Sequence, residues 1–311
     1  MDLAWLYDVL ALAQHKSFSR AAEARHVTQG AFSRRIRSLE GWAGVPLFDR
    51  RTHAVKLTKA GERFVLTAED TLRCLFEGKE AAKQEGGLFE PTVRVAATHS
   101  LALTFFSSWI HSCSSEMKRM AKIQLFSDST QACENMLISG EAQFMLCHYH
   151  PVMRVRLNRP QFQSICIGKD ELMPVSAPDS SGRPRYRLSS TISDAVPLLA
   201  YGEPSGLGQI MKSVLASEMC QYSLRPVFTS HMANVLATLA RNGDGVAWVP
   251  RSLIEADLRD GALVRAGDAR FNVAIQIQIF RPRSRQRPEC EDLWQRINGR
   301  QANVIPLRHK S

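Results

Sequence analysis

The stretch from residue 21 to residue 51 constrains the fold more than any other part of this 311-residue chain. Thr28 can open a helix as its N-cap, because a threonine hydroxyl accepts a backbone N–H that the first helical turn leaves unpaired. Phe32, Ile36 and Leu39 follow at spacings of four and three, which places one apolar stripe along that helix. Another face carries polar and basic side chains, namely Gln29, Ser33, Arg34 and Arg37. The pattern predicts a helix that buries one face and offers the other to a partner.

The exposed face of this helix has the residue types that read DNA in the major groove. Glutamine pairs with adenine and arginine with guanine, while arginine and serine also hold phosphate. Taken alone, the helix has an alternative interpretation as an ordinary amphipathic helix with a solvated basic face. Residues 20–63 contain ten Lys/Arg against four Asp/Glu in a chain of net charge +10, which favours a polyanionic partner. A second basic segment, residues 281–311, is expected to be solvated surface.

The flanking segments turn this helix into a winged helix-turn-helix. An earlier apolar helical stripe comprises Leu6, Val9, Leu10 and Ala13. Ser19 is expected to begin a second short helix, and a break near His26 leads into the helix opened by Thr28. Gly44 ends that helix, and residues 49–57 have the pattern of a small hairpin, the wing. The predicted DNA-binding residues are Thr28, Gln29, Ser33, Arg34, Arg37, Arg50 and Arg51.

The run FSRAAEARHVTQGAFSRRIRSLEGWAGVPLFDRRTHAVKLTKAG closely resembles the winged helix-turn-helix of the LysR-type transcriptional regulators. The resemblance covers roughly residues 3–88 and is most specific at residues 19–22, 28–40, 47–50 and 57–61. Gly30 departs from the family, which more often has Pro or Ser there, but glycine costs little in a first helical turn. The resemblance implies double-stranded DNA as a partner and a homodimer, usually assembled as a dimer of dimers. RNA polymerase is a further candidate partner.

A long helix is expected after the wing, from Thr58 to the glycine pair at residues 86–87. A helix of about 28 residues is roughly 42 Å long, too long to pack wholly inside a small domain. Its apolar stripe predicts dimerisation residues at Phe64, Ala68, Leu72 and Leu75. Pairing with a second copy in coiled-coil fashion explains this stripe, and a simple connector between domains is the alternative. The resemblance to the LysR family favours pairing.

From Thr92 onward, short apolar runs alternate with helical patterns. This alternation predicts an α/β domain with mainly parallel sheets. The order of elements resembles the two-lobed, periplasmic-binding-protein-like effector domain of the LysR family, and residues 243–250, GDGVAWVP, fit a family landmark. The predicted organisation is therefore α/β overall: a winged helix-turn-helix at 1–60, a linker helix at 58–90, an effector domain at 91–300 and a basic tail at 301–311. Within the effector domain, lobe one is expected at 91–166 plus 268–300 and lobe two at 167–267.

Ligands of such folds bind outside the carboxyl ends of the strands, which selects two strand-to-helix turns. The first turn contains Thr98, His99 and Ser100, whose hydroxyls and amides suit an anion or a polar small molecule. The second contains Ser230, His231 and Met232, and the loop at Tyr201 is a third candidate. Each turn has a structural alternative: Thr98 or Ser100 can simply cap a helix, and both histidines can be ordinary hydrogen-bonding residues.

A closer resemblance points to an alternative switch. The segments WLYDVLALAQ, GAFSRRIRSLE, VRVAATHSLAL and GVAWVP resemble the branch of the LysR family that contains the hypochlorite-responsive regulator. That resemblance implies activation by methionine oxidation, which makes an apolar side chain polar and can alter packing. By position, Met232 matches one sensing methionine of that regulator. Leu207 occupies the position of another, so the pattern is incomplete.

Other function classes lack their signatures. The seven cysteines are scattered without a C-x-x-C pair, which indicates free thiols, although thiol sensing remains an alternative. No metal site or cofactor is predicted, and no hydrolase, metalloprotease or nucleotide-binding motif occurs, so an enzyme is not expected. An architectural DNA-binding protein without a ligand is disfavoured by the long α/β region. The chain shows no signal peptide and no membrane-spanning apolar run, so a cytoplasmic protein is expected.

Overall fold

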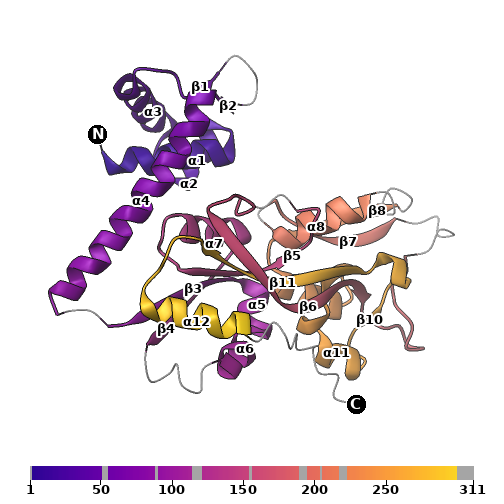
Figure 1. Ribbon diagram of the computed structural model, residues 1–311. Coiled ribbons are helices and arrows are strands. Elements are labelled where there is room, and N and C mark those ends of the chain that lie inside the picture. The colour runs from indigo at the N-terminus through magenta and orange to yellow at the C-terminus, as the bar shows by residue number, and fades with distance from the viewer. Residues whose placement is uncertain are drawn as a thin grey trace. The chain divides into compact units, whose positions relative to one another are not determined.

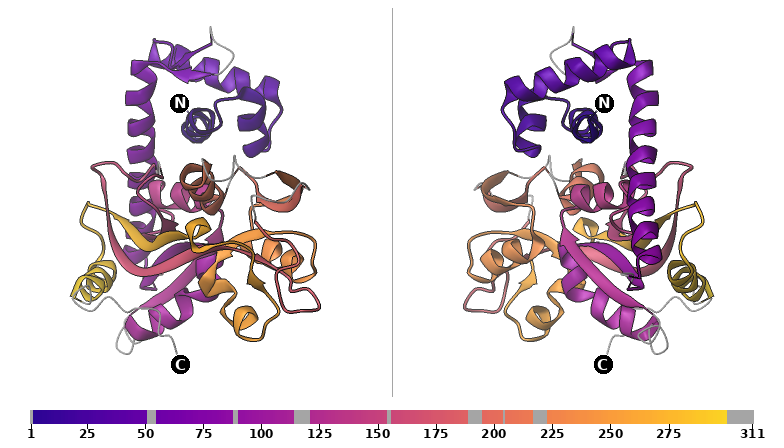
Figure 2. Two further views of the ribbon diagram at one scale, coloured as in Figure 1. Left: turned by 90° about the vertical axis from the view of Figure 1, so that its right-hand side faces the viewer. Right: turned by 90° about the vertical axis from the view of Figure 1, so that its left-hand side faces the viewer.

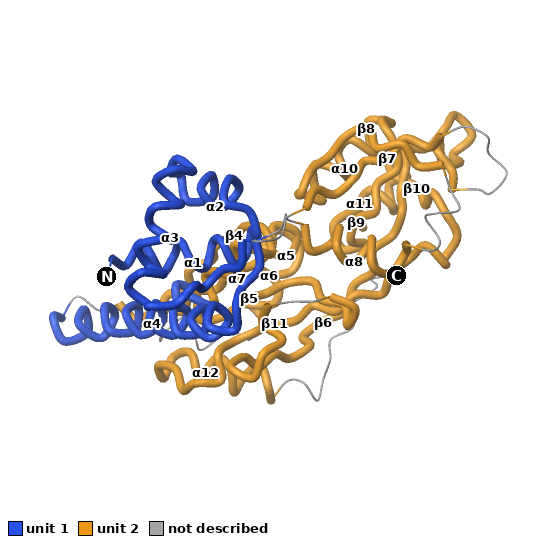
Figure 3. Tube along the Cα trace, turned by 90° about the horizontal axis from the view of Figure 1, so that it is seen from above, with its two compact units in different colours: residues 1–89, 138–141 blue, residues 90–137, 142–311 orange. Residues whose placement is uncertain are grey.

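The computed structural model describes residues 2–50, 55–87, 90–113, 121–153, 156–188, 195–203, 205–216 and 223–299. The chain divides into two compact units, which Figure 3 colours separately. The first contains residues 1–89 and 138–141, and the second contains residues 90–137 and 142–311.

The first unit begins with three helices, labelled in Figure 1: α1 (Leu3–His15), α2 (Phe18–Ala24) and α3 (Gln29–Ala43). Thr28 caps α3 as predicted, because its hydroxyl accepts a hydrogen bond from the Ala31 amide at 3.3 Å. Gly44 ends α3 with φ of 71°, a backbone conformation that glycine adopts without steric cost. The predicted start of α2 was wrong: Ser17, two residues before Ser19, is the N-cap.

The three helices enclose one apolar core. Phe32, Ile36 and Leu39 of α3 are completely buried, which confirms the predicted stripe. The ring of Phe18 at the start of α2 packs edge-on against Phe32, with 6.1 Å between ring centroids, and this contact favours a helix that begins at Phe18. Strand β1 (Phe48–Asp49) pairs antiparallel with β2 (Lys56–Leu57), as expected for a wing; residues 51–54 lie outside the described residues.

The linker helix α4 (Lys59–Glu85) has 27 residues and is capped by Thr58, whose hydroxyl accepts from the Gly61 amide at 3.0 Å. The residues of its apolar stripe differ in burial within the first unit. Ala68 and Leu72 are buried in the same core as α3, whereas Leu75 is 51% exposed. Phe64 is partly exposed, so Phe64 and Leu75 are the two residues of the predicted stripe with accessible surface within the first unit.

The second unit is built on a seven-stranded sheet in the order β10-β6-β11-β5-β3-β4, with β9 paired to β6. Strand β3 is parallel to both β4 and β5, but β11 is antiparallel to β5 and β6, and β6 is antiparallel to β9 and β10. The prediction of mainly parallel sheets was thus wrong for this sheet, because β11 runs antiparallel to both of its neighbours, and β9 and β10 run antiparallel to β6. The strands are β3 (Thr92–Thr98), β4 (Lys122–Asp128), β5 (Phe144–Tyr149), β6 (Phe162–Ser176), β9 (Ala247–Pro250), β10 (Val264–Arg265) and β11 (Val273–Pro282).

Strands β6 and β11 lie side by side through the second unit and connect its two lobes (Figure 2). In the predicted division, lobe one contains β3, β4 and β5, and lobe two contains β9, β10 and a separate parallel pair, β7 (Val196–Tyr201) with β8 (Leu224–Ser230). The helices of the second unit are α5 (His99–Thr104), α6 (Phe106–Cys113), α7 (Thr130–Ile138), α8 (Gly206–Val214), α10 (Ala233–Arg241), the short 3₁₀ helix η2 (Arg251–Leu253), α11 (Glu255–Arg259), a 3₁₀ turn at Ala269–Phe271 and α12 (Pro288–Gly299). The architecture is the predicted α/β one, with a winged helix-turn-helix, a long linker helix and a two-lobed domain.

Candidate DNA-binding surface and effector cavity

The outer face of α3 carries the side chains predicted to meet DNA. Arg34 and Arg37 are exposed, and Ser33 is partly exposed. The side chain of Gln29 is exposed and accepts a hydrogen bond from the Ser19 hydroxyl at 3.2 Å, which orients it beside the start of α2. These positions suit a recognition helix, and contact with DNA stays a prediction.

Arg50 has partners within the unit that the sequence did not suggest. Its guanidinium donates to Glu40 at 2.6 Å and lies over the ring of Phe18, 5.3 Å from the centroid. The other carboxylate oxygen of Glu40 accepts from the amides of Leu47 and Phe48 at 2.9 and 3.1 Å. Glu40 therefore ties α3 to the first strand of the wing, and Arg50 is held in place by it. Arg51 lies outside the described residues.

Asp8, like Glu40, is a carboxylate that connects elements of this unit, and the sequence analysis did not predict its role. It is fully buried on α1, and its carboxylate accepts from Arg25 at 2.9 Å and lies 3.5 Å from Arg35. These contacts join α1 to the end of α2 and to α3, so they fix the angle of the helix-turn-helix. Sequence periodicity cannot detect such a group, because an aspartate within an apolar stripe normally indicates solvent exposure.

A small cavity lies at the carboxyl ends of β3, β4 and β5, where the fold predicts a ligand site. Its volume is about 30 Å³. Four predicted residues line it, namely Thr98, His99, Ser100 and His231. Seven further residues complete the lining: Asp128, Ser129, Thr130, His148, Ser205, Gly206 and Leu207. The lining is therefore rich in hydroxyl and imidazole groups and includes one carboxylate.

Thr98 does not act as the helix cap that its position suggested. It occupies the N-cap position of α5, but its side chain makes no capping hydrogen bond. Its hydroxyl oxygen is buried and has no hydrogen-bond partner among the described residues. Because a buried unpaired polar atom costs free energy, this hydroxyl favours a bound molecule or water in the cavity.

The two histidines predicted to face the cleft lie opposite each other. The ring centroids of His99 and His231 are 5.9 Å apart. His99 lies at the start of α5 in lobe one, where its Nδ1 is 3.0 Å from the Ser127 hydroxyl, and His231 follows β8 of lobe two. A molecule bound in the cavity beside these two rings would contact both lobes.

The other three candidate residues lie outside the cavity lining. Ser230 accepts a hydrogen bond from the Met232 amide at 3.1 Å and so shapes the turn before α10. Met232 is partly exposed, and Tyr201 is buried with no hydrogen-bond partner for its hydroxyl among the described residues. Burial raises the pKa of Tyr201 far above its ordinary value, so its hydroxyl stays protonated.

Two serines bring helix N-termini to the cavity. The Ser129 hydroxyl accepts from the Ala132 amide at the start of α7, and the Ser205 hydroxyl accepts from the Gly208 amide at the start of α8. The amino ends of helices favour negative charge. Asp128 opposes that preference, although one of its oxygens already accepts from the Ser129 amide at 2.6 Å. The strand-to-helix pattern that selected residues 98–100 recurs at residues 128–130 and could have identified this turn.

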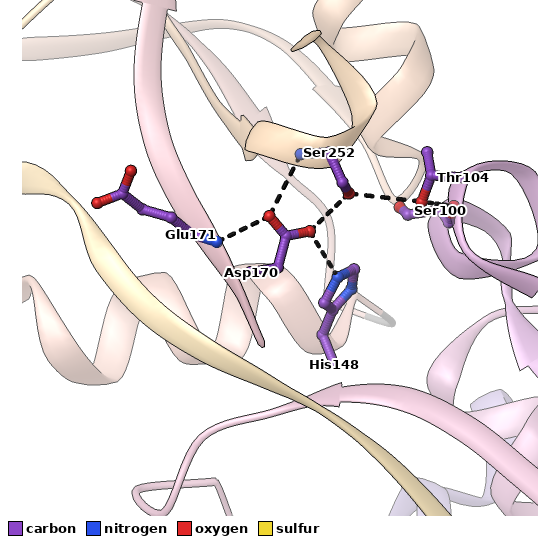
Figure 4. A network of polar contacts seen from close by, with 6 residues as sticks. All are labelled: Ser100, Thr104, His148, Asp170, Glu171 and Ser252. Atoms are coloured by element: carbon purple, nitrogen blue, oxygen red, sulfur yellow. Dashed lines mark hydrogen bonds and ion pairs between the residues drawn. The ribbon is translucent and has the colours of Figure 1, made fainter. Parts of the chain in front are cut away.

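A buried polar network, drawn in Figure 4, reaches the cavity wall through His148. His148 Nε2 lies 3.3 Å from Asp170, and the Ser252 hydroxyl donates to the same carboxylate at 2.6 Å. These residues come from β5, β6 and η2, so the network spans both lobes. No local sequence pattern connects them.

Three of the seven cysteines are poor candidates for the thiol-sensing alternative. Burial raises the pKa of Cys133 and Cys290 to about 12 and also raises that of Cys147. Thiolates are the reactive form, so these three are expected to be inert. Across the described ranges, no group of three metal-ligating side chains occurs, and no helix is long and apolar enough to cross a membrane.

Comparison with known proteins assigns both units to one family. The profile of the "LysR substrate binding domain" matches residues 86–302, and that of the "bacterial regulatory helix-turn-helix protein, lysR family" matches residues 3–62. The chain belongs to the LysR family of transcriptional regulators. This assignment confirms the prediction of a LysR-type winged helix-turn-helix followed by a LysR-type effector domain.

Several full-length LysR-type relatives cover nearly the whole chain. The regulator YjiE of Escherichia coli K12 is 29% identical over 96% of this chain and 94% of its own length. The structure of DarR from Vibrio fischeri, solved in complex with DNA, is 31% identical, with a TM-score of 0.58 over 96% of this chain and 98% of that one. HypT from Salmonella typhimurium, described as a hypochlorite-specific LysR-type regulator, is 29% identical with a TM-score of 0.60 over 97% and 99%. Its regulatory domain, 25% identical with a TM-score of 0.58 over 69% of this chain and 97% of that one, has been solved with bromide bound.

Proposed function

We propose that this LysR-type regulator binds specific DNA through α3 and responds to a small polar molecule held in the cavity of its effector domain. The family assignment supplies the general function, a DNA-binding transcriptional regulator with an effector domain. The exposed Gln29, Arg34 and Arg37 support sequence reading by α3. The wing would then add phosphate contacts through Arg50 and Arg51, and Arg50 also pairs with Glu40.

The observation that carries the effector proposal is the unpaired hydroxyl of Thr98 in a cavity lined from both lobes. A polar ligand there could accept or donate the missing hydrogen bond, and Ser100 and the two facing histidines could add others. A ligand biases the two lobes only if it binds one arrangement better than another. A change from mostly off to mostly on requires a preference of about 5.5 kcal/mol, which a few buried polar contacts can supply.

A thermal-shift screen of small polar metabolites with the full-length chain tests this proposal. A ligand of the native protein raises the unfolding midpoint, Tm, by mass action. The variant with both Thr98→Ala and Ser100→Ala should lose the Tm shift given by a cavity ligand and keep its affinity for DNA selected in vitro from random sequence. Equal Tm shifts for this variant and the wild type, with every active compound, would remove the first turn from the ligand site.

Met232 supports a second candidate function, sensing of oxidants such as hypochlorite. Met232 is a partly exposed residue at the N-cap position of α10, next to His231. Oxidation to the sulfoxide would place a polar group at a turn that adjoins the cavity. The similarity to HypT motivates this candidate. Met232→Leu should abolish a transcriptional response to hypochlorite and spare a response to a metabolite, whereas an unchanged hypochlorite response in this variant would exclude Met232.

Homodimerisation through α4 is part of the proposal, with a dimer of dimers as the expected final assembly. The exposed Leu75 and the partly exposed Phe64 are the predicted seam residues that remain accessible within the first unit. Ala68 and Leu72 are buried in the core of the first unit, so they would hold α4 in place and would not contact the second copy directly. Contact with RNA polymerase and a cytoplasmic location remain further parts of the proposed function.

A further inference from the structure

We infer that the second unit has another ligand site, a surface pocket beside β10 that binds a small organic anion with two or more negative groups. Three arginines line this arginine pocket, namely Arg183, Arg187 and Arg265, together with Asp179 and Asp268. Its volume is about 400 Å³, which is the size of a small-molecule site. None of these five residues lines the cavity at the carboxyl ends of β3, β4 and β5, so the inference goes beyond the proposed effector function.

The arginine pocket is lined by a loop and by the end of an edge strand. The loop, residues 177–188, follows β6, and β10 ends at Arg265. Strand β10 is at one end of the seven-stranded sheet and pairs with β6 (Figure 1). The Leu188 amide donates to the Ala266 carbonyl at 2.7 Å, and the Ala266 amide donates to the Pro174 carbonyl at 3.0 Å. Both sides of the pocket are therefore attached to the same pair of strands.

Hydrogen bonds fix the loop before any ligand binds. One carboxylate oxygen of Asp179 accepts from the Ser181 amide and hydroxyl at 2.8 and 2.6 Å and from the Arg183 amide at 3.0 Å. The Asp179 amide in turn donates to the Arg183 carbonyl at 2.6 Å. Because the backbone of the loop is already ordered, a ligand has to order only the arginine side chains, which lowers the cost of binding.

Two of the three guanidinium groups have no partner within the described part of the chain. Arg183 donates from Nε to the Ser181 hydroxyl at 2.9 Å and lies 3.9 Å from Asp179. Among the described residues, Arg187 and Arg265 form no hydrogen bond or ion pair, and both are exposed. A guanidinium binds a carboxylate or a phosphate through two parallel N–H groups. Two such groups at one pocket suit a ligand with two anionic groups.

The two carboxylates of the lining have arginine neighbours of their own. Asp179 lies beside Arg183, and Asp268 lies 3.8 Å from Arg270, which is not part of the lining. The charges of Arg187 and Arg265 are therefore the ones that remain for a ligand. A monoanion can pair with only one of them, whereas a dianion or trianion can pair with both.

The remaining lining leaves room for the carbon skeleton of a ligand. It consists of small or apolar residues, namely Pro184, Ala266 and Gly267. A Cβ atom at Gly267 would lie 2.8 Å from the ring of Phe271, so this segment packs directly against a buried aromatic side chain. An apolar lining with a few convergent charged groups is typical of small-molecule sites. Di- and tricarboxylates and organic phosphates share the chemistry that this pocket selects.

Thermal shift with citrate and with pyrophosphate tests the inference. The Tm of the full-length chain is measured against each sodium salt at constant ionic strength, with sodium acetate as the balancing salt, and the dissociation constant follows from the Tm dependence. Citrate and pyrophosphate carry several charges, whereas acetate is a monoanion. A rise in Tm with citrate supports a carboxylate ligand, and a rise with pyrophosphate supports a phosphate ligand. No rise with either probe overturns the inference.

Arg187→Gln and Arg265→Gln should each weaken binding of the active probe at least about fivefold, because each removes a charged pair of donors. Asp268→Asn should leave binding unchanged or strengthen it. Arg259→Gln is the matched control, because it removes an exposed arginine of α11 that does not line the pocket. It should bind the probe like wild type, since general effects of the salt act on every variant alike.

The variant with both Thr98→Ala and Ser100→Ala separates the arginine pocket from the cavity. It should keep the wild-type response to citrate or pyrophosphate, and loss of that response would place the probe in the cavity and overturn the inference. Wild-type binding by Arg187→Gln and Arg265→Gln, or equal weakening in Arg259→Gln, would overturn it as well. Because the two sites share no residue, either of those results leaves the proposed effector function standing.

Discussion

Glu40 offers the sharpest test of how the recognition helix is joined to the wing. Its carboxylate accepts from the Leu47 and Phe48 amides and from Arg50. Leu47 and Phe48 are buried, so their amides have no ready access to water once the carboxylate is removed. A hydrogen bond to a charged group contributes about 1.5–3 kcal/mol, and two that share one oxygen should together contribute about 2–4 kcal/mol.

Glu40→Ala should therefore increase the hydrogen-exchange rates of the Leu47 and Phe48 amides by about 30- to 1,000-fold, since each 1.4 kcal/mol corresponds to a factor of ten. Exchange detected by mass spectrometry on the peptide spanning residues 41–50 of the full-length chain gives this ratio directly. Glu40→Gln is the control, because it keeps an acceptor for both amides and weakens only the partly exposed pair with Arg50, worth about 0.2–1 kcal/mol. Comparable protection in Glu40→Ala and wild type would refute the assigned role of Glu40.

Three further outcomes follow from the described contacts. Gln29→Ala should cost about 1–3 kcal/mol on the preferred DNA site and relax selection at one base position, whereas Arg51→Ala should weaken all sequences alike; in vitro selection followed by fluorescence anisotropy separates the two. Leu75→Glu should place an unpaired charge in the proposed seam and shift sedimentation toward the monomer with little loss of Tm, and an unchanged dimer would remove Leu75 from the seam. Because the pKa of Asp170 is lowered in the folded chain, its stabilising contribution is present above the ordinary value of 3.8 and disappears as the pH falls through the lower folded value. Asp170→Asn should accordingly lose less Tm than wild type on acidification below about pH 4, and parallel losses would contradict that pKa.

Local chemistry made the first unit predictable from the sequence. The spacing of Phe32, Ile36 and Leu39 and the caps at Thr28 and Thr58 are properties of adjacent residues, and the structure confirms them. The start of α2 was missed because two serines flank Phe18 and both can act as caps. The packing of Phe18 against Phe32 favours the earlier start, and that contact is not local.

Long-range pairing explains what the sequence did not reveal in the second unit. Within strand β6, Lys169, Asp170 and Glu171 interrupt the apolar pattern, so the pattern alone does not extend the strand through them. The strand continues through them because the buried Asp170 carboxylate accepts a hydrogen bond from Ser252 and lies 3.3 Å from His148, residues that are 82 and 22 positions away in the chain. Its antiparallel pairing with β11 joins residues about 100 positions apart and leaves no trace in the local alternation of either strand.

The cavity was predictable only in part for the same reason. A strand-to-helix turn can be recognised locally, which identified residues 98–100 and His231. Which turns face the same space depends on strand order, and this brings Asp128 and His148 into the lining and leaves Met232 and Tyr201 outside it.

The most direct test of the whole account is the linkage between the two binding sites of the full-length chain. The dissociation constant for the selected DNA is measured with and without a compound that binds the cavity, and the constant for that compound is measured with and without the DNA. An effector-controlled regulator requires both constants to change by the same factor, typically between about 5- and 150-fold. The account predicts this reciprocal change in wild type and its loss when Thr98→Ala is combined with Ser100→Ala. A cavity ligand that leaves the affinity for DNA unchanged would contradict the account.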